Sequence, residues 1–454
     1  MRFTHGAATW LFLRILGVVY FVAFASLAVQ ITALVGPHGI VPGPPWATDA
    51  MLRLLTIGGA AVALLLVAGL VPIPVLLVLW LDYLVVSSVG AEFLSYQWDA
   101  LLLETGLLAL FVAPPVWRER VDRLVDPPPL SRALMLWLLF RLMVGSGVVK
   151  LASGDPTWRH LTALTFHYET QPLPTPLAWY AHRLPLWFQE ASTVAVFIVE
   201  ILEPFTMFGP RRLRVAGFAA LVGLQLLIAL TGNYAFFNLL SIALCLFLLG
   251  EARPSGRSIV QSRAAFVYAI VTLPVSFAMF LASCGIDFFP APVVVLADLV
   301  APLHSVNGYG LFAVMTTTRD EIVVEGSDDG VTWRPYEFRY KPGDVRRAPP
   351  WVAPHQPRLD WQMWFASLTT YDNVPWFQNF CVRLLQGSPA VLALLADNPF
   401  PTRPPRYVRA ELYRYRFSGP APSGGADTCP RCWWTRERVG DYSPVLTLGP
   451  ASRN

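Results

Sequence analysis

Residues 134–151 read LMLWLLFRLMVGSGVVKL, and this stretch decides the fold class of the chain. It is long and apolar enough to cross a membrane as a helix. It also carries two cations, Arg141 and Lys150, and a charge in hydrocarbon is costly unless it has a partner or lines a wet cavity. The stretch therefore predicts a helix inside a bundle whose other helices supply carboxylates.

The composition extends this prediction to the whole chain. Of the 454 residues, 55% are hydrophobic and only 14% are charged, and the mean hydropathy is +0.49. These values are too apolar for an ordinary soluble domain and predict a polytopic α-helical membrane protein of about nine spans. The predicted spans are residues 10–35, 52–70, 73–89, 98–113, 134–151, 192–208, 213–230, 234–249 and 264–281.

From residue 307 the sequence predicts a C-terminal α+β domain with a β-rich core. The turn Ser327-Asp328-Asp329-Gly330 lies between two apolar runs, which is typical of a hairpin. A helical region is expected over residues 359–396 and a strand over residues 408–417. The predicted organisation is a transmembrane domain at 1–285, a connecting interfacial segment at 286–306 and the C-terminal domain at 307–454.

The arginines predict the orientation of the chain. Alternate loops hold arginine clusters, at residues 118–132, 211–214 and 253–263, whereas the intervening loops at 36–45 and 90–97 hold none. By the positive-inside rule the N-terminus is cytoplasmic and the C-terminal domain is extracytoplasmic. The net charge of +4 is modest and its arginines lie in short loops, so no nucleic acid partner is expected.

Ionisable residues within the apolar runs predict a membrane charge network. Asp82, Arg141 and Glu200 fall near the middle of their predicted spans, and Glu203 is expected to share one helical face with Glu200. We expect Arg141 to pair with Asp82 or Glu200, while Asp99 and Lys150 lie near the outer ends. Two interpretations stay open, namely structural ion pairs that lock helices together and a cavity with a function.

Neither the histidines nor the cysteines predict a metal or a cofactor. His160 and His167 are seven residues apart with Glu169 nearby, but the spacing fixes no third ligand. Cys429 and Cys432 form a C-x-x-C pair outside the membrane, which could form or exchange a disulfide. No thioredoxin-like pattern surrounds them, so the sequence favours a structural pair over redox catalysis.

Several long strings resemble the lipase maturation factor family over nearly the full length of the chain. They are FLSYQWDALLLETG at 93–106, residues 141–158, HYETQPLP at 167–174, GNY at 232–234, NGYGLF at 307–312, residues 321–333, YKPGD at 340–344 and PHQPRLDWQMWF at 354–365. Lysine occurs only at Lys150 and Lys341, which is typical of a GC-rich bacterial genome, so a bacterial member is expected.

The resemblance implies an integral membrane protein whose C-terminal domain faces the lumen of the endoplasmic reticulum in eukaryotes. In a bacterium the equivalent site is the plasma membrane, with that domain outside. The family helps secreted lipases fold and assemble into active dimers. The resemblance thus implies a folding or assembly factor whose partners are an exported client, for example a lipase, and membrane lipid.

A second resemblance suggests an alternative function. The helix end Ser146-Gly147-Val148-Val149-Lys150-Leu151 is similar to one in the vitamin K-dependent carboxylase-like transmembrane domain, where a lysine serves as the catalytic base. This resemblance implies a membrane enzyme that uses Lys150 with Asp99, Glu104 or His167. A lysine partly removed from water can act as a base near neutral pH.

The proline-rich stretch from residue 349 predicts a surface that binds the client. Prolines order its backbone in advance, and large apolar groups are seldom exposed on a monomer unless a partner covers them. The candidate residues for client binding are Trp351, His355, Arg358, Asp360 and Trp361.

Overall fold

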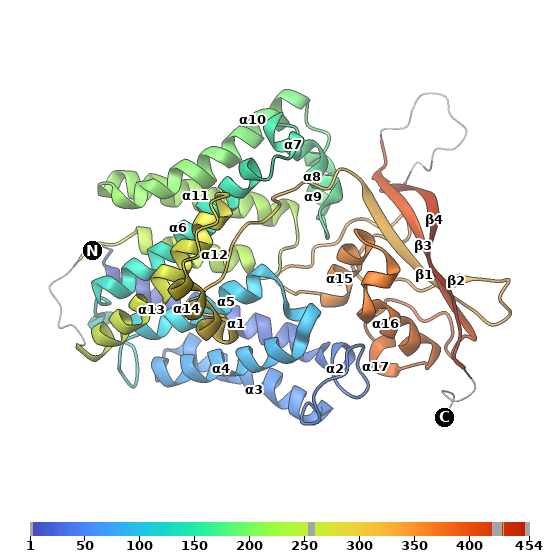
Figure 1. Cartoon of the computed structure of the whole chain (residues 1–454), viewed down its shortest axis with the longest axis horizontal. Helices are drawn as coiled ribbons and strands as arrows, with labels where there is room; N and C mark the ends of the chain where they lie inside the picture. The colour runs from blue at the N-terminus through green and yellow to red at the C-terminus, as the bar shows by residue number, and fades with distance from the viewer. Residues whose placement is uncertain (1–2, 253–258, 420–428, 430, 450–454) are drawn as a thin grey trace.

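The computed structural model describes residues 3–252, 259–419, 429 and 431–449. Figure 1 shows a bundle of long helices formed by the N-terminal two thirds of the chain, and a sheet with short helices at one end of that bundle. The buried apolar side chains of the two parts form one continuous core, from Phe12 of the first helix to Ala410 of the sheet. The predicted division at residues 285 and 307 stays a prediction.

The chain runs from one end of the bundle to the other nine times within the residues described. Seven of these passes are helices long and apolar enough to cross a membrane. The other two predicted spans, α5 and α12, are shorter helices that lie mostly buried among the rest. The passes are α1 (His5–Ala28), α3 (Asp49–Ala68), α4 (Pro72–Gly90), α5 (Gln97–Val112), α6 (Pro129–Ala152), α10 (Leu186–Phe197) continued by η3 (Ile198–Leu202) and η4 (Glu203–Phe208), α11 (Arg211–Thr231), α12 (Phe237–Cys245) with η5 (Leu246–Leu248), and α13 (Ile259–Ser283).

The loops that carry arginine gather at one end of the bundle. Glu251 forms a backbone bridge with Thr4 and an ion pair with Arg211, and Arg118 forms a bridge with Leu70. The remaining short elements are η2 (Val121–Arg123) at this end, and α2 (Ile31–Leu34), η1 (Ala91–Leu94), α7 (Pro156–Arg159), α8 (Ala163–Thr170) and α9 (Pro176–Ala181) at the end that meets the sheet. Arg118 and Arg211 thus lie at one end of the bundle, as the alternation of the arginines predicts, whereas Arg253 and Arg257 lie outside the described residues.

The segment predicted as an interfacial connection runs back along α13 toward the middle of the bundle, and its place at a membrane interface stays a prediction. After α13 the short helix α14 (Ala291–Val300) with η6 (Ala301–Leu303) runs back along α13, where Val300 packs on Val275. The Tyr268 hydroxyl donates to the Ser305 carbonyl at 2.8 Å, near the middle of α13. Irregular backbone at that depth is tolerated only when protein surrounds it and its polar groups are bonded.

An ion pair in the middle of the bundle forms hydrogen bonds with the segment that follows η6. Arg141 of α6 is bonded to Glu104 of α5, and it also donates to the Asn307 carbonyl at 3.0 Å. The second oxygen of Glu104 accepts from the Asn307 amide at 3.1 Å and from the Tyr309 hydroxyl at 2.8 Å. Residues 307–309 are thereby fixed between two helices before the chain leaves the bundle.

The C-terminal part is a four-stranded antiparallel sheet with strand order β2-β1-β3-β4. The predicted hairpin and the predicted strand at 408–417 are confirmed, whereas the last strand was not predicted because charged residues at 436–438 mask its alternation. The helical region at 359–396 is also confirmed. The elements are β1 (Arg319–Ser327), β2 (Arg334–Pro335), α15 (Arg358–Ser367), η7 (Tyr371–Asn373), α16 (Pro375–Leu385), α17 (Pro389–Leu392), β3 (Tyr407–Phe417) and β4 (Trp434–Leu446).

A buried arginine at the start of α15 attaches this part to the bundle. The Arg358 side chain is 1% exposed, and its two terminal nitrogens each lie 2.8 Å from one oxygen of Asp99 on α5. The same guanidinium donates to the Phe93 carbonyl at 2.6 Å, and the Tyr83 hydroxyl donates to Asp99. Such a bidentate pair fixes orientation as well as position.

We expect Arg358→Met to lower the thermal unfolding midpoint of the detergent-solubilised protein strongly. The loss corresponds to about 3–5 kcal/mol, because the Asp99 carboxylate stays buried without its cation. Adding Asp99→Leu should recover much of the loss. Arg403→Met, at a largely exposed arginine, is the control. If Arg358→Met unfolded like the control, the pair would not hold the two parts together.

Candidate functional site

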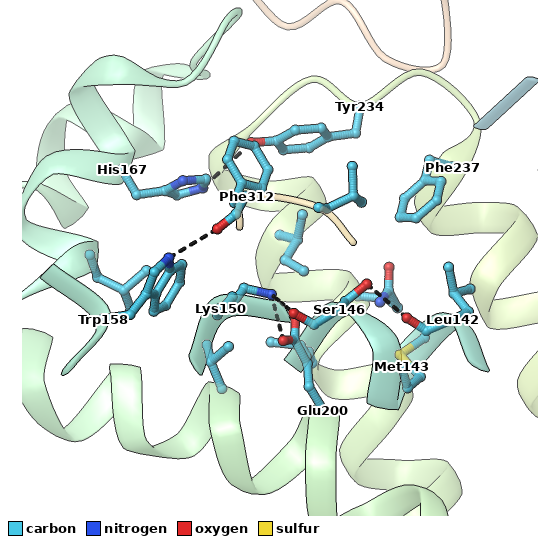
Figure 2. Close-up of a pocket in the computed structure, with 16 residues that line it drawn as sticks. Leu142, Met143, Ser146, Lys150, Trp158, His167, Glu200, Tyr234, Phe237 and Phe312 are labelled. Carbon is cyan, nitrogen blue, oxygen red and sulfur yellow. Dashed lines mark hydrogen bonds and ion pairs between the residues drawn. The ribbon is translucent and has the colours of Figure 1, made fainter. Parts of the chain in front are cut away.

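A cavity of about 90 Å³ lies inside the bundle, close to the end that meets the sheet. Figure 2 shows that side chains from several helices and from the strand-like segment after residue 310 converge on it. Apolar side chains form most of its wall. The lining residues are Leu142, Met143, Ser146, Lys150, Trp158, Leu164, His167, Val196, Glu200, Leu224, Gln225, Ile228, Tyr234, Phe237, Leu311 and Phe312.

A buried ion pair forms the polar part of the wall. Lys150 Nζ lies 2.6 Å from Glu200 Oε2 and donates to the Ser146 carbonyl at 3.0 Å. Both side chains are buried, and the indole of Trp158 lies 5.4 Å from the ammonium. The pair keeps the site neutral overall, which a buried site in a membrane requires.

The local sequence explains how Glu200 reaches the bundle interior. Residues Ile198–Leu202 form a π-helical turn, and Pro204 follows at the start of η4. Proline has no backbone N–H, so the regular helical hydrogen bond to the Glu200 carbonyl cannot form. Turns of this kind occur often at functional sites.

A glycine on α6 makes room for this turn. A Cβ atom at Gly147 would lie 2.5 Å from Ile201 Cγ1 and 3.0 Å from the Cβ atom of Glu200. Because such distances are not tolerated, any larger residue would push η3 away from α6 and lengthen the Lys150–Glu200 contact.

His167 and Tyr234 form a second polar group on the cavity wall. The Tyr234 hydroxyl donates to Gln171 Oε1 at 2.8 Å and lies 3.4 Å from His167 Nε2. The ring of Phe312 stands edge-on to the imidazole at 4.8 Å. Burial, and then the charge of Lys150, lower the pKa of His167 to about 4, so the imidazole is neutral at physiological pH.

The expected partners in the charge network are corrected by this geometry. Arg141 pairs with Glu104, and neither Asp82 nor Glu200 is its partner. Glu104 pairs with Arg141 because it lies near the middle of the adjacent helix α5, whereas the π-helical turn directs Glu200 to Lys150. In the part of the chain that the structure describes, Asp82 and Glu203 make no ion pair.

The residues of the enzyme alternative do not form one site. Lys150 and His167 line the cavity, but Asp99 is bonded to Arg358 and Glu104 to Arg141. Glu200, which that reading omitted, is the partner of Lys150.

Most of the predicted client-binding residues are not on the surface. Arg358, Asp360 and Trp361 are buried, and His355 is half-buried with its Nδ1 atom 2.9 Å from Ser26 Oγ. Trp351 is the one of the five that is strongly exposed, at 55%. The string 354–365 looked like a docking surface because it is aromatic and polar, but its polar groups bond to the helical bundle.

A cluster of buried charged side chains beside the sheet was not predicted from the sequence. Arg319 and Lys341 both pair with Glu321, at 2.7 and 2.9 Å. Arg319 also donates to the carbonyls of residue 169, in the last turn of α8, and of residues 171 and 172, just after it. Arg319 and Glu321 are two apart on a strand and so share a face, which was the available signal.

Cys429 and Cys432 form a disulfide, one of the two outcomes expected for the pair. Within the described residues, no group of three or more His, Cys, Asp or Glu side chains could hold a metal ion. His160 and His167 accordingly have no third ligand beside them.

We expect the folded protein to lose stability between pH 7 and pH 5, in part through His167. The pKa is about 4 when folded and about 6.5 when unfolded, so the folded state binds fewer protons in this window. Stability is therefore complete above about pH 6.5 and falls as the pH drops toward 4.

The test compares unfolding of the parent and of His167→Gln at pH 7 and pH 5. The variant should lose less stability on acidification, by about 1–2 kcal/mol. His38→Gln, at an exposed histidine, should keep the slope of the parent. Equal slopes in parent and His167→Gln would show that this imidazole is not held neutral by the fold.

The comparisons with known proteins agree along the whole chain. The family model described as "Lipase maturation factor transmembrane domain" matches residues 7–46 and 44–254, and "Lipase maturation factor C-terminal domain" matches residues 305–444. Lipase maturation factor 2 of Gallus gallus is 37% identical, over 97% of this chain and 81% of the relative. Lipase maturation factor 1 of Mus musculus is 33% identical, over 98% of this chain and 88% of the relative. No solved structure gives a significant match. The chain belongs to the lipase maturation factor family.

Proposed function

We propose that this protein is a membrane-embedded maturation factor that helps an exported client, specifically a lipase, to fold or assemble. We infer a lipase as the client from the names of the relatives, which are called lipase maturation factors and align over nearly the whole chain. The proposal needs no catalytic step, cofactor or metal.

One structural observation supports this function most directly. The C-terminal part is fixed to one end of the bundle, at the opposite end from the loops that carry arginine. By the positive-inside rule the arginine end is cytoplasmic, so the C-terminal part is extracytoplasmic. The disulfide between Cys429 and Cys432 fits an oxidising compartment, and we assign it a structural role. The membrane is the plasma membrane in a bacterium and the endoplasmic reticulum membrane in a eukaryote.

The surface proposed for the client is the exposed part of the stretch from residue 349. Trp351 is exposed, and the same loop continues to a polar groove of about 270 Å³ at the junction of the two parts. The groove is lined by Arg339, Tyr340, His355 and Asp360 together with Val29, Gln30, Pro357, Leu359, Ala393 and Leu394. An exposed indole beside polar groups is the kind of contact that dominates protein interfaces.

We expect Trp351→Ala to lower the activity of a co-expressed secreted lipase without lowering the amount of this protein. Loss of one interface tryptophan costs about 2 kcal/mol or more of binding, so the active client should fall severalfold. Trp187→Ala, at an indole 67% exposed on α10, is the matched control. The proposed surface would be wrong if both variants supported the lipase as the parent does.

The orientation has its own test. Reporter fusions after Ala113, Phe208 and Leu249 should report the cytoplasm, and fusions after Leu151 and at Asn454 should report the opposite side, because the first three positions lie at the arginine end of the bundle. A cytoplasmic signal at Asn454 would remove the basis for an exported client.

A further inference from the structure

The ion pair that lines the cavity has unused hydrogen-bonding capacity on both partners. The ammonium of Lys150 has three N–H bonds, and two of them are directed to Glu200 and to the Ser146 carbonyl. Among the residues that the structure describes, neither the third N–H nor Glu200 Oε1 has a hydrogen-bond partner. The imidazole of His167 likewise leaves Nδ1 unbonded to any described residue. The Lys150–Glu200 pair and His167 therefore offer unused polar atoms at one cavity, whose lining is mostly apolar but also includes Ser146, Gln225 and Tyr234 (Figure 2).

The cavity lies one helix layer away from the lipid-facing surface. Val196 of α10 and Leu224 and Ile228 of α11 form part of its wall, and all three are only half-buried. The neighbouring residues Leu226 and Leu227 of α11 are strongly exposed apolar side chains, as expected for a face that meets lipid.

The two helices touch closely at the far end but not beside the cavity. A Cβ atom at Gly217 of α11 would lie 2.0 Å from Thr206 Oγ1 of η4, so α11 and η4 are in tight contact there. Nearer the sheet, both helices contribute to the cavity wall, α10 through Val196 and α11 through Leu224 and Ile228. We take the boundary between these half-buried side chains as the path by which an acyl chain would reach the cavity.

We propose that this cavity binds the head of an uncharged single-chain lipid with free hydroxyl groups, of the monoacylglycerol class, whose acyl chain leaves between α10 and α11. A hydroxyl can accept from Lys150 and donate to Glu200 Oε1, and a second hydroxyl can donate to His167 Nδ1, because the proton of the neutral imidazole lies on Nε2 toward the Tyr234 hydroxyl. The apolar walls take the first methylenes of the chain.

The charges in the cavity wall disfavour binding of the charged head groups of other common lipids. The site already contains one cation and one anion in contact, so it is neutral overall. A carboxylate or phosphate head would meet Glu200 as well as Lys150, and a choline head would meet Lys150 as well as Glu200. In a site removed from water, an added unpaired charge is strongly unfavourable. The cavity volume of about 90 Å³ further excludes a double-chain head with a bulky substituent.

The test is photolabelling of the intact protein in phosphatidylcholine nanodiscs. The probe is a monoacylglycerol with a diazirine near the head end of its chain, and labelled peptides are mapped by mass spectrometry. Labelling should concentrate on the segments of α6, α10 and α11 that line the cavity. Leu224→Trp, which fills the cavity from α11, should reduce labelling of the α6 segment about tenfold, the effect of about 1.4 kcal/mol in binding.

Two controls make the result decisive. Leu227→Trp adds the same indole to the exposed face of α11 and should leave labelling at the level of the parent. Ile228→Trp is a second cavity-filling variant in case Leu224→Trp fails to fold, as judged by its unfolding midpoint. The fatty acid probe with the same chain should label the α6 segment about tenfold less, because its head is an anion.

Labelling of α6 that is equal in the parent and in both cavity-filling variants would overturn the site. Equal labelling by the fatty acid probe would overturn the uncharged head. The assay contains no client protein, so its failure would leave the proposed maturation function untouched.

Discussion

Every ionised side chain that this fold removes from water must be given a partner, and that requirement determines how distant parts of the chain meet. Asp99 and Arg358 are 259 residues apart, yet their contact joins α5 to the start of α15. Glu104 and Arg141 join α5 to α6 and also fix residues 307–309 between them. Breaking such a pair costs far more than the intact pair contributes over an apolar substitute. The pairs therefore act mainly by excluding other arrangements of the helices and of the C-terminal part.

The backbone carbonyls of residues 169–174 also need hydrogen-bond partners when they are removed from water. This segment begins with the last two residues of α8 and continues past the end of that helix, where its carbonyls have no partner within the helix. Arg319 of the sheet donates to three of them, Trp364 donates to the carbonyl of residue 170, and Asn233 donates to the carbonyl of residue 173. Elements from the sheet, α15 and the α11–α12 loop thus meet on one short segment. A C-terminal part held in this way is a rigid surface rather than a tethered domain, which suits a factor that must present a fixed face to its client.

The sequence was sufficient for features that depend on local pattern and insufficient for features that depend on three-dimensional pairing. Apolar run length and arginine alternation predicted the helical passes and their common ends, and the Asp-Gly turn predicted the hairpin at β1. The partner of Arg141 could not be predicted, because several carboxylates lie at similar depth and helix adjacency selects among them. The burial of Arg358 and Trp361 was missed for a related reason: a stretch rich in aromatic and polar residues has the same composition at a docking surface and at an interface within one chain. The Glu200 side chain points into the bundle because residues Ile198–Leu202 form a π-helical turn. The sequence could not predict that turn, because it depends on the close packing of Gly147 against Ile201.

Three of the buried ion pairs that support the fold differ from one another, and the difference identifies the one with room for another role. Both oxygens of Asp99 and both oxygens of Glu104 accept hydrogen bonds from surrounding groups. Arg141 Nε and Arg358 Nε are buried without a hydrogen-bond partner among the described residues, so these two pairs are not complete either. What sets Lys150 and Glu200 apart is that their unused donor and acceptor lie beside a cavity. A pair that is kept incomplete next to open volume is better explained by a third molecule that completes it than by the stability of the helices alone.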